Sequence, residues 1–269
     1  MSDIGYLKET IQEAGDFLVG DGADRESQTK LNAKDLVTVS DIKAQDLIRR
    51  RLLEKYPDAI VLSEEDTAEQ QRPMFESDFT GYILDPIDGT YNFKRDMRES
   101  AISIGYIENG QLSAGVVYDP YKNELFEAQV GQGAFCNGQA IHVSDQQTID
   151  GASIGTSNSY DGAAMERNLR RQLAIYEQTG IMPWTHVHGS GVLIMTNIAS
   201  GRFDAYHHNG LKPWDNAAAF LIIREAGGVV HTLTGEEAPY TSATVLCGTL
   251  AVVAELEWVF ADIDQSLLA

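Results

Sequence analysis

The chain contains 269 residues, of which 43% are hydrophobic and 22% are charged, and its formal charge at pH 7 is −20. This composition excludes a disordered tail, a collagen-like repeat and a disulfide-rich miniprotein, and the length is enough for one large domain or two modest ones. The excess of acidic residues argues against nucleic acid and against an anionic membrane surface as partners.

Two features bear on the location of the protein. The N-terminal residues lack the basic and apolar regions of a signal peptide, and the longest stretch without Asp, Glu, Lys or Arg, residues 178–201, is too polar to cross a membrane. Cys136 and Cys247 are isolated in the sequence, which is typical of a reducing compartment. We therefore expect a soluble cytoplasmic protein.

The apolar pattern of the first half predicts both helices and strands. Apolar residues recur at helical spacing over residues 3–19, and residues 20–34 are polar and are expected to form a mobile loop. A second helix is predicted to end at about Tyr56, before Pro57. Strands are predicted at residues 36–39, 59–62, 81–84, 101–107, 112–118 and 124–130, the last three as an antiparallel meander.

The second half continues this mixture of elements. Helices are predicted over residues 162–178, 189–200, 216–226 and 251–267, and strands at 152–156, 228–233 and 244–247. Interleaved helices and mixed strands indicate a layered α/β or α+β fold. A weak change in composition divides the chain into residues 1–147 and 148–269, which we expect to form one continuous globular unit.

Residues 84–90 are the densest group of potentially reactive side chains. A predicted buried strand is followed by Asp85 and Asp88, three positions apart, in a turn shaped by Pro86 and Gly89. The two carboxylates and the carbonyl of Ile87 can converge on one point, which is oxygen ligation suited to Mg²⁺. The alternative is an ordinary Asp-Gly turn with a capping aspartate.

Other acidic residues also lie where predicted strands end or helices begin. Glu64 and Glu65 follow one strand, where a solvated loop is the alternative explanation. Asp41 and Asp215 precede or begin predicted helices, where capping explains them without chemistry. Because α/β folds gather functional groups at strand and helix ends, all four are candidates for one site.

Together these segments resemble the inositol monophosphatase family of Mg²⁺-dependent, lithium-sensitive phosphatases. The resemblance runs from about Asp35 to Ala226, and its two signatures are residues 85–90 and residues 214–218, with Glu64-Glu65 and residues 35–38 upstream. It implies the layered αβαβα sandwich of sugar phosphatases, commonly a homodimer. It also implies a small-molecule phosphate ester as the partner.

The resemblance also implies roles for individual residues. Two Mg²⁺ ions are expected on Glu64, Asp85, the Ile87 carbonyl, Asp88 and Asp215, four of them in the N-terminal half and Asp215 in the C-terminal half. Asp41 matches a third-metal or water-positioning role, with Glu65 close by. Thr90 is expected to pair with Asp41 and orient the attacking water, while the amides of Gly89 and Thr90 hold the phosphate. Lys30 falls where the family places a lysine near the site.

Charge balance supports this assignment from the chemistry. Four carboxylates without a cation repel a dianionic phosphate, whereas two Mg²⁺ ions cancel their charge, activate water and stabilise the attacking and leaving oxygens. We expect a phosphomonoesterase with inositol-1-phosphate as the default substrate. Fructose 1,6-bisphosphate, 3′-phosphoadenosine 5′-phosphate and NADP(H) are alternatives, and a non-catalytic metal-binding regulator with the same fold is a less favoured one.

The segment before Trp214 bears on the substrate. The family usually has a glutamate here that hydrogen-bonds inositol hydroxyls, and His208 falls at its position. A histidine cannot accept two such hydrogen bonds and is expected to gain positive charge near neutral pH, which favours a more anionic substrate. The alternative is that His208 is a solvated residue at the rim. Ser190 and Gly191 match a substrate-pocket segment of the family, and helix packing explains them equally well.

Helical spacing gives two further expectations. Arg167, Arg170 and Arg171 lie on the helix predicted at 162–178 and are expected to form a solvated face, with a distal phosphate contact as the alternative. The apolar stripe of the last helix is expected to place Trp258 in the core.

Overall fold

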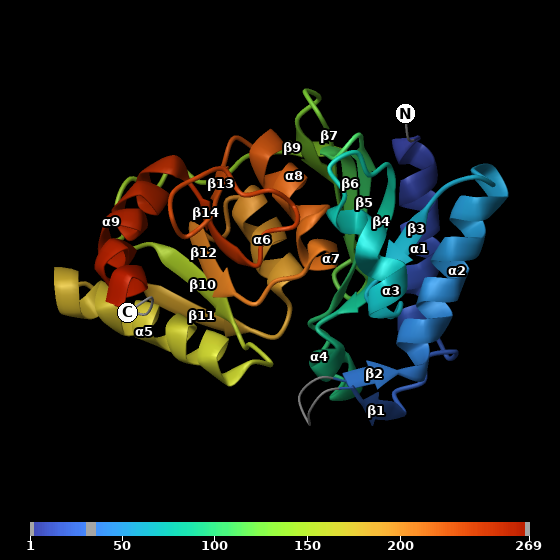
Figure 1. Cartoon of the computed structure of the whole chain (residues 1–269), viewed down its shortest axis with the longest axis horizontal. Coiled ribbons are helices and arrows are strands. Elements are labelled where there is room, and N and C mark those ends of the chain that lie inside the picture. Colours follow the sequence, from blue (N-terminus) through green and yellow to red (C-terminus); the bar gives the residue numbers. More distant parts are fainter. Residues whose placement is uncertain (1–2, 31–35, 267–269) are drawn as a thin grey trace.

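Two main β-sheets alternate with layers of helices in the computed structural model, which describes residues 3–30 and 36–266 (Figure 1). The larger sheet has the strand order β3-β4-β5-β6-β7-β8-β9. β3 runs parallel to β4, and the other neighbouring pairs are antiparallel. Its strands are β3 (Val61–Ser63), β4 (Gly81–Asp88), β5 (Ala101–Glu108), β6 (Gln111–Asp119), β7 (Glu124–Gln129), β8 (Ala134–Cys136) and β9 (Gln139–Ile141).

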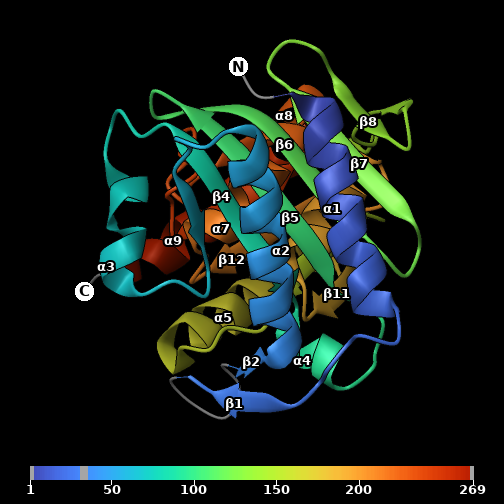
Figure 2. The same cartoon turned by 90° about the vertical axis from the view of Figure 1, so that its right-hand side faces the viewer.

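Helices α1 (Ile4–Val19) and α2 (Val39–Lys55) cover the outer face of this sheet (Figure 2). Their apolar sides pack together and against β4, β5 and β6. The side chain of Asp3 accepts a hydrogen bond from the backbone N–H of Tyr6, which fixes the start of α1. Short elements complete this half: β1 (Ser27–Thr29), β2 (Leu36–Thr38), α3 (Ala68–Gln71), the 3₁₀ helix η1 (Arg72–Phe75) and α4 (Thr90–Lys94).

The smaller sheet has the strand order β11-β10-β12-β14-β13. β10 is parallel to both of its neighbours, and the pairs of β14 with β12 and β13 are antiparallel. The strands are β10 (Ser153–Ser157), β11 (Trp184–His188), β12 (Ala205–Asn209), β13 (Val229–His231) and β14 (Thr244–Gly248). The two sheets lie in separate stretches of the chain, and the division into residues 1–147 and 148–269 stays a prediction.

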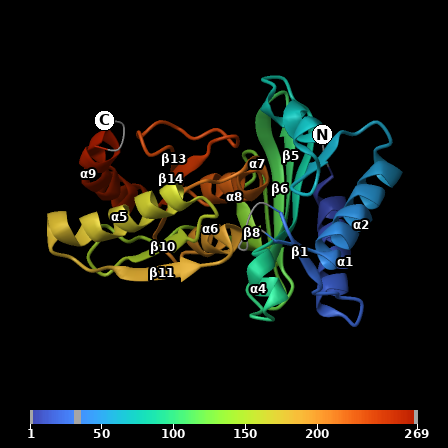
Figure 3. The ribbon, with the colours of Figure 1, turned by 60° about the horizontal axis from the view of Figure 1, so that its bottom comes forward.

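Helices fill the space between the sheets and cover the outer face of the smaller one. α6 (Gly191–Ala199) and α8 (Ala219–Glu225) lie between the sheets, and α7 (Pro213–Asn216) precedes α8 (Figure 1). α5 (Gly162–Thr179) and α9 (Leu250–Ser266) lie on the far side of the smaller sheet (Figure 3). The order of layers is therefore αβαβα, which confirms the predicted fold class.

A close contact in the middle layer sets the position of α7. A Cβ at Gly105 of β5 would lie 2.5 Å from the Cβ of Ala217, so only glycine allows the chain after α7 to lie directly on β5. Ala217 is itself fully buried in the core between the two sheets. Asp215, two positions earlier, is thereby held beside the end of β4.

Most predicted elements are confirmed with small shifts of their ends, including the meander β5 to β7 and the helices α1, α2, α5 and α9. Strands β8, β9, β11 and β12 were not predicted. The predicted loop at residues 20–34 contains β1, and its residues 31–34 lie outside the described part of the chain, as does Asp35.

The helix predicted at 216–226 is present as α8, which begins three residues later, and the short helix α7 before it was not predicted. Asp215 lies within the first turn of α7 rather than at the N-cap of α8. Pro213 stands at the first position of α7, where its fixed φ favours an earlier helix start.

Two side chains of the outer helices also differ from the expectations. Arg171 is 1% exposed, and its guanidinium lies 5.8 Å from the ring centroid of Phe260 instead of on a solvated face. Trp258 of α9 is 66% exposed, whereas Val259 and Phe260 beside it are buried. Of the helices within the described ranges, none has the length and apolar character to cross a membrane.

Candidate active site

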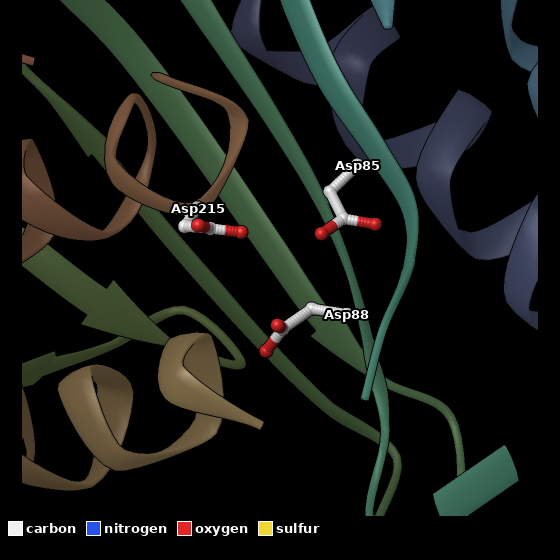
Figure 4. Close-up of side chains that lie close together, drawn as sticks. All are labelled: Asp85, Asp88 and Asp215. Atoms are coloured by element: carbon white, nitrogen blue, oxygen red, sulfur yellow. The ribbon is translucent and has the colours of Figure 1, made fainter. Parts of the chain in front are cut away.

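Three aspartates from both halves of the chain meet at one point. Asp85 and Asp88 lie in the last part of β4, and Asp215 lies in α7. One carboxylate oxygen of each lies within 4.8 Å of the others, and Figure 4 shows the three groups around a shared space. Carboxylates so close together repel one another unless protons or cations lie between them.

The end of β4 explains how two of these side chains converge. Strand pairing with β5 is irregular between Asp85 and Asp88, and the backbone N–H of Ile87 donates a hydrogen bond to Asp85 Oδ1 at 3.0 Å. Gly89 follows with φ +88°, and a Cβ there would lie 3.1 Å from the carbonyl oxygen of Glu99. A glycine is therefore required where β4 ends and α4 begins.

The start of α6 orients Asp88. Ser190 is the N-cap of α6, and its hydroxyl donates a hydrogen bond to Asp88 Oδ2. The backbone N–H of Val192 donates to the same oxygen at 2.9 Å. Gly191 lines a small cavity beside Asp88. Ser190, which was expected to contact substrate, thus contacts Asp88, and the other carboxylate oxygen of Asp88 has neither of these contacts.

The start of α7 orients Asp215. The backbone N–H of Lys212 donates a hydrogen bond to Asp215 Oδ2 at 2.7 Å. Asp215 can therefore both cap α7 and take part in the cluster, because Oδ2 accepts the capping hydrogen bond and the carboxylate has a second oxygen.

Glu64 lines the same pocket as the three aspartates and its charge acts on Asp85, but it lies outside their group of closest oxygens. Lys30 Nζ lies 2.9 Å from Glu64 Oε1 and 2.7 Å from Glu65 Oε1. Burial acts to lower the pKa of Lys30, but the charges of Glu64 and Glu65 outweigh it and raise the pKa above its ordinary value. Lys30 is therefore a cation that contacts both of these side chains.

Asp41 and Thr90 are adjacent, as the resemblance implied. Asp41 Oδ2 accepts hydrogen bonds from the backbone N–H of Thr38 at 2.7 Å and from its hydroxyl at 2.5 Å, which is the predicted capping interaction. Thr90 Oγ1 lies 3.4 Å from Asp41 Oδ1 and 3.0 Å from the Ile87 carbonyl oxygen. The hydroxyl of Thr90 therefore stands between Asp41 and the main chain of the aspartate cluster.

The electrostatics of the cluster favour a bound cation. Burial, followed by the charge of Glu64, raises the pKa of Asp85 well above its ordinary value, and burial with the charge of Asp88 does the same for Asp215. Burial also raises the pKa of Asp88 and that of Asp41 to about 6. Buried carboxyl groups ionise with difficulty when no positive charge is near, so a bound cation would stabilise their ionised form. Carboxylate oxygens suit a small hard cation such as Mg²⁺.

A pocket of about 580 Å³ extends from the aspartates. This volume is typical of small-molecule sites. Several of its lining residues were not predicted; they come from the segments before α5 and after β12: Ser159, Tyr160, Asp161, Gly210 and Lys212. Trp214 belongs to the signature at residues 214–218, and the only signal for Lys212 was its closeness to that signature in the sequence.

His208 differs from both expectations. It is 4% exposed in β12, so it is not a solvated rim residue. Its Nδ1 lies 3.0 Å from Asn168 Nδ2, and Asn168 Oδ1 accepts a hydrogen bond from the backbone N–H of Asn209, which fixes the orientation of this amide. Burial, with the charge of Arg171, lowers the pKa of His208 to about 4. His208 is therefore neutral, and the expected positive charge is wrong.

Comparison with known proteins adds a second line of evidence. The family described as "Inositol monophosphatase family" matches residues 6–267. Inositol monophosphatase 1 of Rattus norvegicus is 33% identical over 228 residues, covering 84% of this chain and 81% of that protein. The fructose-1,6-bisphosphatase/inositol-1-monophosphatase of Thermotoga maritima is 35% identical over 214 residues, covering 78% and 77%. The solved Thermotoga maritima IMPase has a TM-score of 0.85 at 28% identity and covers 99% of each chain. The chain therefore belongs to the inositol monophosphatase family of phosphatases.

Proposed function

We propose that this chain is a Mg²⁺-dependent phosphomonoesterase that hydrolyses a small phosphorylated polyol or nucleotide by attack of water. The observation that carries the proposal is the meeting of Asp85, Asp88 and Asp215 in the wall of a pocket large enough for such an ester. Membership of a phosphatase family supports the reaction type.

The proposed metal ligands are Glu64, Asp85, the Ile87 carbonyl, Asp88 and Asp215. These donors are carboxylate and carbonyl oxygens, which Mg²⁺ prefers. Bound there, two Mg²⁺ ions, or three with Asp41, supply positive charge that polarises the phosphate ester and the attacking water. Ser190 and Lys212 support this set, because their hydrogen bonds hold one oxygen of Asp88 and one of Asp215 in place.

Thr90, Asp41 and Gly89 have proposed roles toward water and phosphate. The hydroxyl oxygen of Thr90 and the carboxylate of Asp41, 3.4 Å apart, are suited to orient a water molecule by accepting hydrogen bonds from it. The amides of Gly89 and Thr90 are proposed to donate hydrogen bonds to the phosphate, where α4 begins. Glu64 is proposed to assist as a base as well as a ligand.

Inositol-1-phosphate is the default substrate because of the family, and fructose 1,6-bisphosphate is supported by the name of the Thermotoga maritima relative. 3′-Phosphoadenosine 5′-phosphate and NADP(H) complete the set. We expect Mg²⁺-dependent phosphate release from at least one of these four substrates, abolished by EDTA and reduced by Li⁺. Release is measured colorimetrically at neutral pH.

The outcomes of this assay separate the proposals. Release that persists in EDTA would contradict the metal-dependent mechanism. A folded protein that releases no phosphate from any of the four, yet binds Mg²⁺ in a calorimetric titration, would favour the non-catalytic regulator. Unaltered turnover in Li⁺ would contradict only the expected lithium sensitivity.

A homodimer is proposed on the edge strand β11. Within the described residues, β11 pairs only with β10, and its other edge has no neighbouring strand. Trp184 and Met182 are each 72% exposed, and Leu169, Leu173 and Tyr176 of α5 are exposed at helical spacing nearby. Residues 178–201 carry no Asp, Glu, Lys or Arg, so two chains of charge −20 can meet here with little repulsion.

We expect wild-type protein to elute as a dimer by size-exclusion chromatography with light scattering, and Trp184→Asp to elute as a monomer. A charge placed in an apolar interface is costly because it loses hydration. Trp258→Asp is the matched control, since Trp258 is also exposed but lies on α9. A wild-type monomer, or a dimer that persists in Trp184→Asp, would contradict this interface.

A cytoplasmic location is proposed for the same chain. Cys136 and Cys247 form no disulfide, which fits a reducing compartment.

A further inference from the structure

We propose that Lys212 binds a second anionic group on the substrate, so that the enzyme prefers phosphate esters that carry a further phosphate or carboxylate. This inference rests on the proposed phosphatase function and names a specificity-determining residue for it. Lys212 lines the main pocket together with the metal-binding aspartates, and its side chain is exposed to the pocket and to solvent.

The other basic groups of the site are already engaged or uncharged. Lys30 is bound to Glu64 and Glu65 at 2.9 and 2.7 Å. His208 is buried, and its Nδ1 accepts a hydrogen bond from Asn168, so it presents no positive charge. Among the ion pairs of the described residues, none involves Lys212, although its charge acts on Asp215.

The position of Lys212 relative to the aspartates is fixed by its main chain. Its backbone N–H donates a hydrogen bond to Asp215 Oδ2 at 2.7 Å. The main chain of Lys212 therefore lies next to the aspartate cluster. The side chain is long and flexible, and an ammonium group binds phosphate as a point charge without strict geometry. In a protein of charge −20, a basic group that lines the pocket and makes no ion pair within the described residues attracts an anion locally.

The pocket also leaves room for the part of the substrate that would carry the second anion. Tyr160 and Trp214 also line it, and its volume of about 580 Å³ exceeds that needed for a single phosphate. Asp161 also lines the pocket, but its Oδ1 accepts a hydrogen bond from the backbone N–H of Ala163 at 3.0 Å. This carboxylate therefore has a structural partner in the cap of α5.

The test compares fructose 1,6-bisphosphate with fructose 6-phosphate in wild type, Lys212→Met and Lys94→Met. Lys94 is exposed in α4 and does not line the pocket, so its replacement controls for net charge. The kcat/KM for the bisphosphate divided by that for the monophosphate is expected to fall about tenfold or more in Lys212→Met. This is the size expected for loss of a charge-assisted contact. Most of the fall is expected in KM, and Lys212→Arg is expected to restore the ratio partly.

Equilibrium binding separates failure of this inference from failure of the proposed function. Both sugars are titrated calorimetrically into wild type and Lys212→Met with Ca²⁺ replacing Mg²⁺. A wild-type preference for the bisphosphate that Lys212→Met loses supports the role of Lys212 even if no phosphate is released. A preference equal in the two proteins, or absent from wild type, overturns it.

Discussion

Replacing Asp88 with asparagine is expected to reduce the rate of Mg²⁺-dependent phosphate release at least about 100-fold. Loss of a residue that only holds a metal ligand in place typically reduces activity by about 10- to 100-fold. Asparagine is neutral and binds Mg²⁺ more weakly than a carboxylate. Its side-chain oxygen can still accept the hydrogen bonds that Ser190 and Val192 donate. The loss of turnover is therefore expected without loss of the fold. The measurement is kcat/KM on the best substrate of the four, beside circular dichroism.

The same substitution is expected to raise the melting temperature of the protein in EDTA. Burial raises the pKa of Asp88 to about 6, and its carboxylate adds repulsion to Asp85 and Asp215. Removing that charge stabilises the native state, and each kcal/mol corresponds to about 2–4 °C for a chain of this size. Asp150→Asn, in an exposed turn, is the control for net charge. Wild-type turnover in Asp88→Asn would show that Asp88 is not a metal ligand.

The sequence was sufficient to predict the pair of aspartates at the end of β4, because the residues that position them are neighbours in the chain. Asp85 and Asp88 are three positions apart, and the strand, proline and glycine around them leave few possible geometries. Their meeting with Asp215 is different, because it depends on how closely the chain lies on Gly105 of β5. The position of these residues at strand and helix ends, together with the family resemblance, indicated that they share a site, but no spacing in the sequence encodes the distance between them.

The contact between α5 and β12 could not be predicted from hydrophobic pattern. β12 is buried along its whole length yet contains His207, His208 and Asn209, so its residues do not look like a core strand. Asn168 of α5 satisfies His208 and Asn209 through hydrogen bonds. Arg171 was assigned to a solvated face for the same reason. A polar interface leaves no periodic apolar signal, so β12 was not predicted and Arg171, on the correctly predicted α5, was assigned to the wrong face.

In EDTA, the stability of the wild-type protein is expected to fall as the pH rises from about 4 to 8. Burial raises the pKa of Asp41 and Asp88 to about 6 and that of Glu65 to about 8, while unfolded carboxyl groups titrate near pH 4. Between these values the native state holds more protons than the unfolded state, so the free energy of unfolding decreases with pH. The full contribution is present below about pH 4 and is lost as each native group ionises.

Mg²⁺ is expected to reverse this loss, because it binds the ionised carboxylates of the native state. The rise in melting temperature on adding Mg²⁺, at matched ionic strength, should be several degrees larger at pH 8 than at pH 5. Asp85→Asn provides the control, since Asp85 is fully buried in the cluster and its replacement should weaken both the pH dependence and the Mg²⁺ effect. Repulsion spread over the acidic surface would instead give the same pH dependence in wild type and Asp85→Asn. Equal curves would therefore place the destabilising charge outside the cluster.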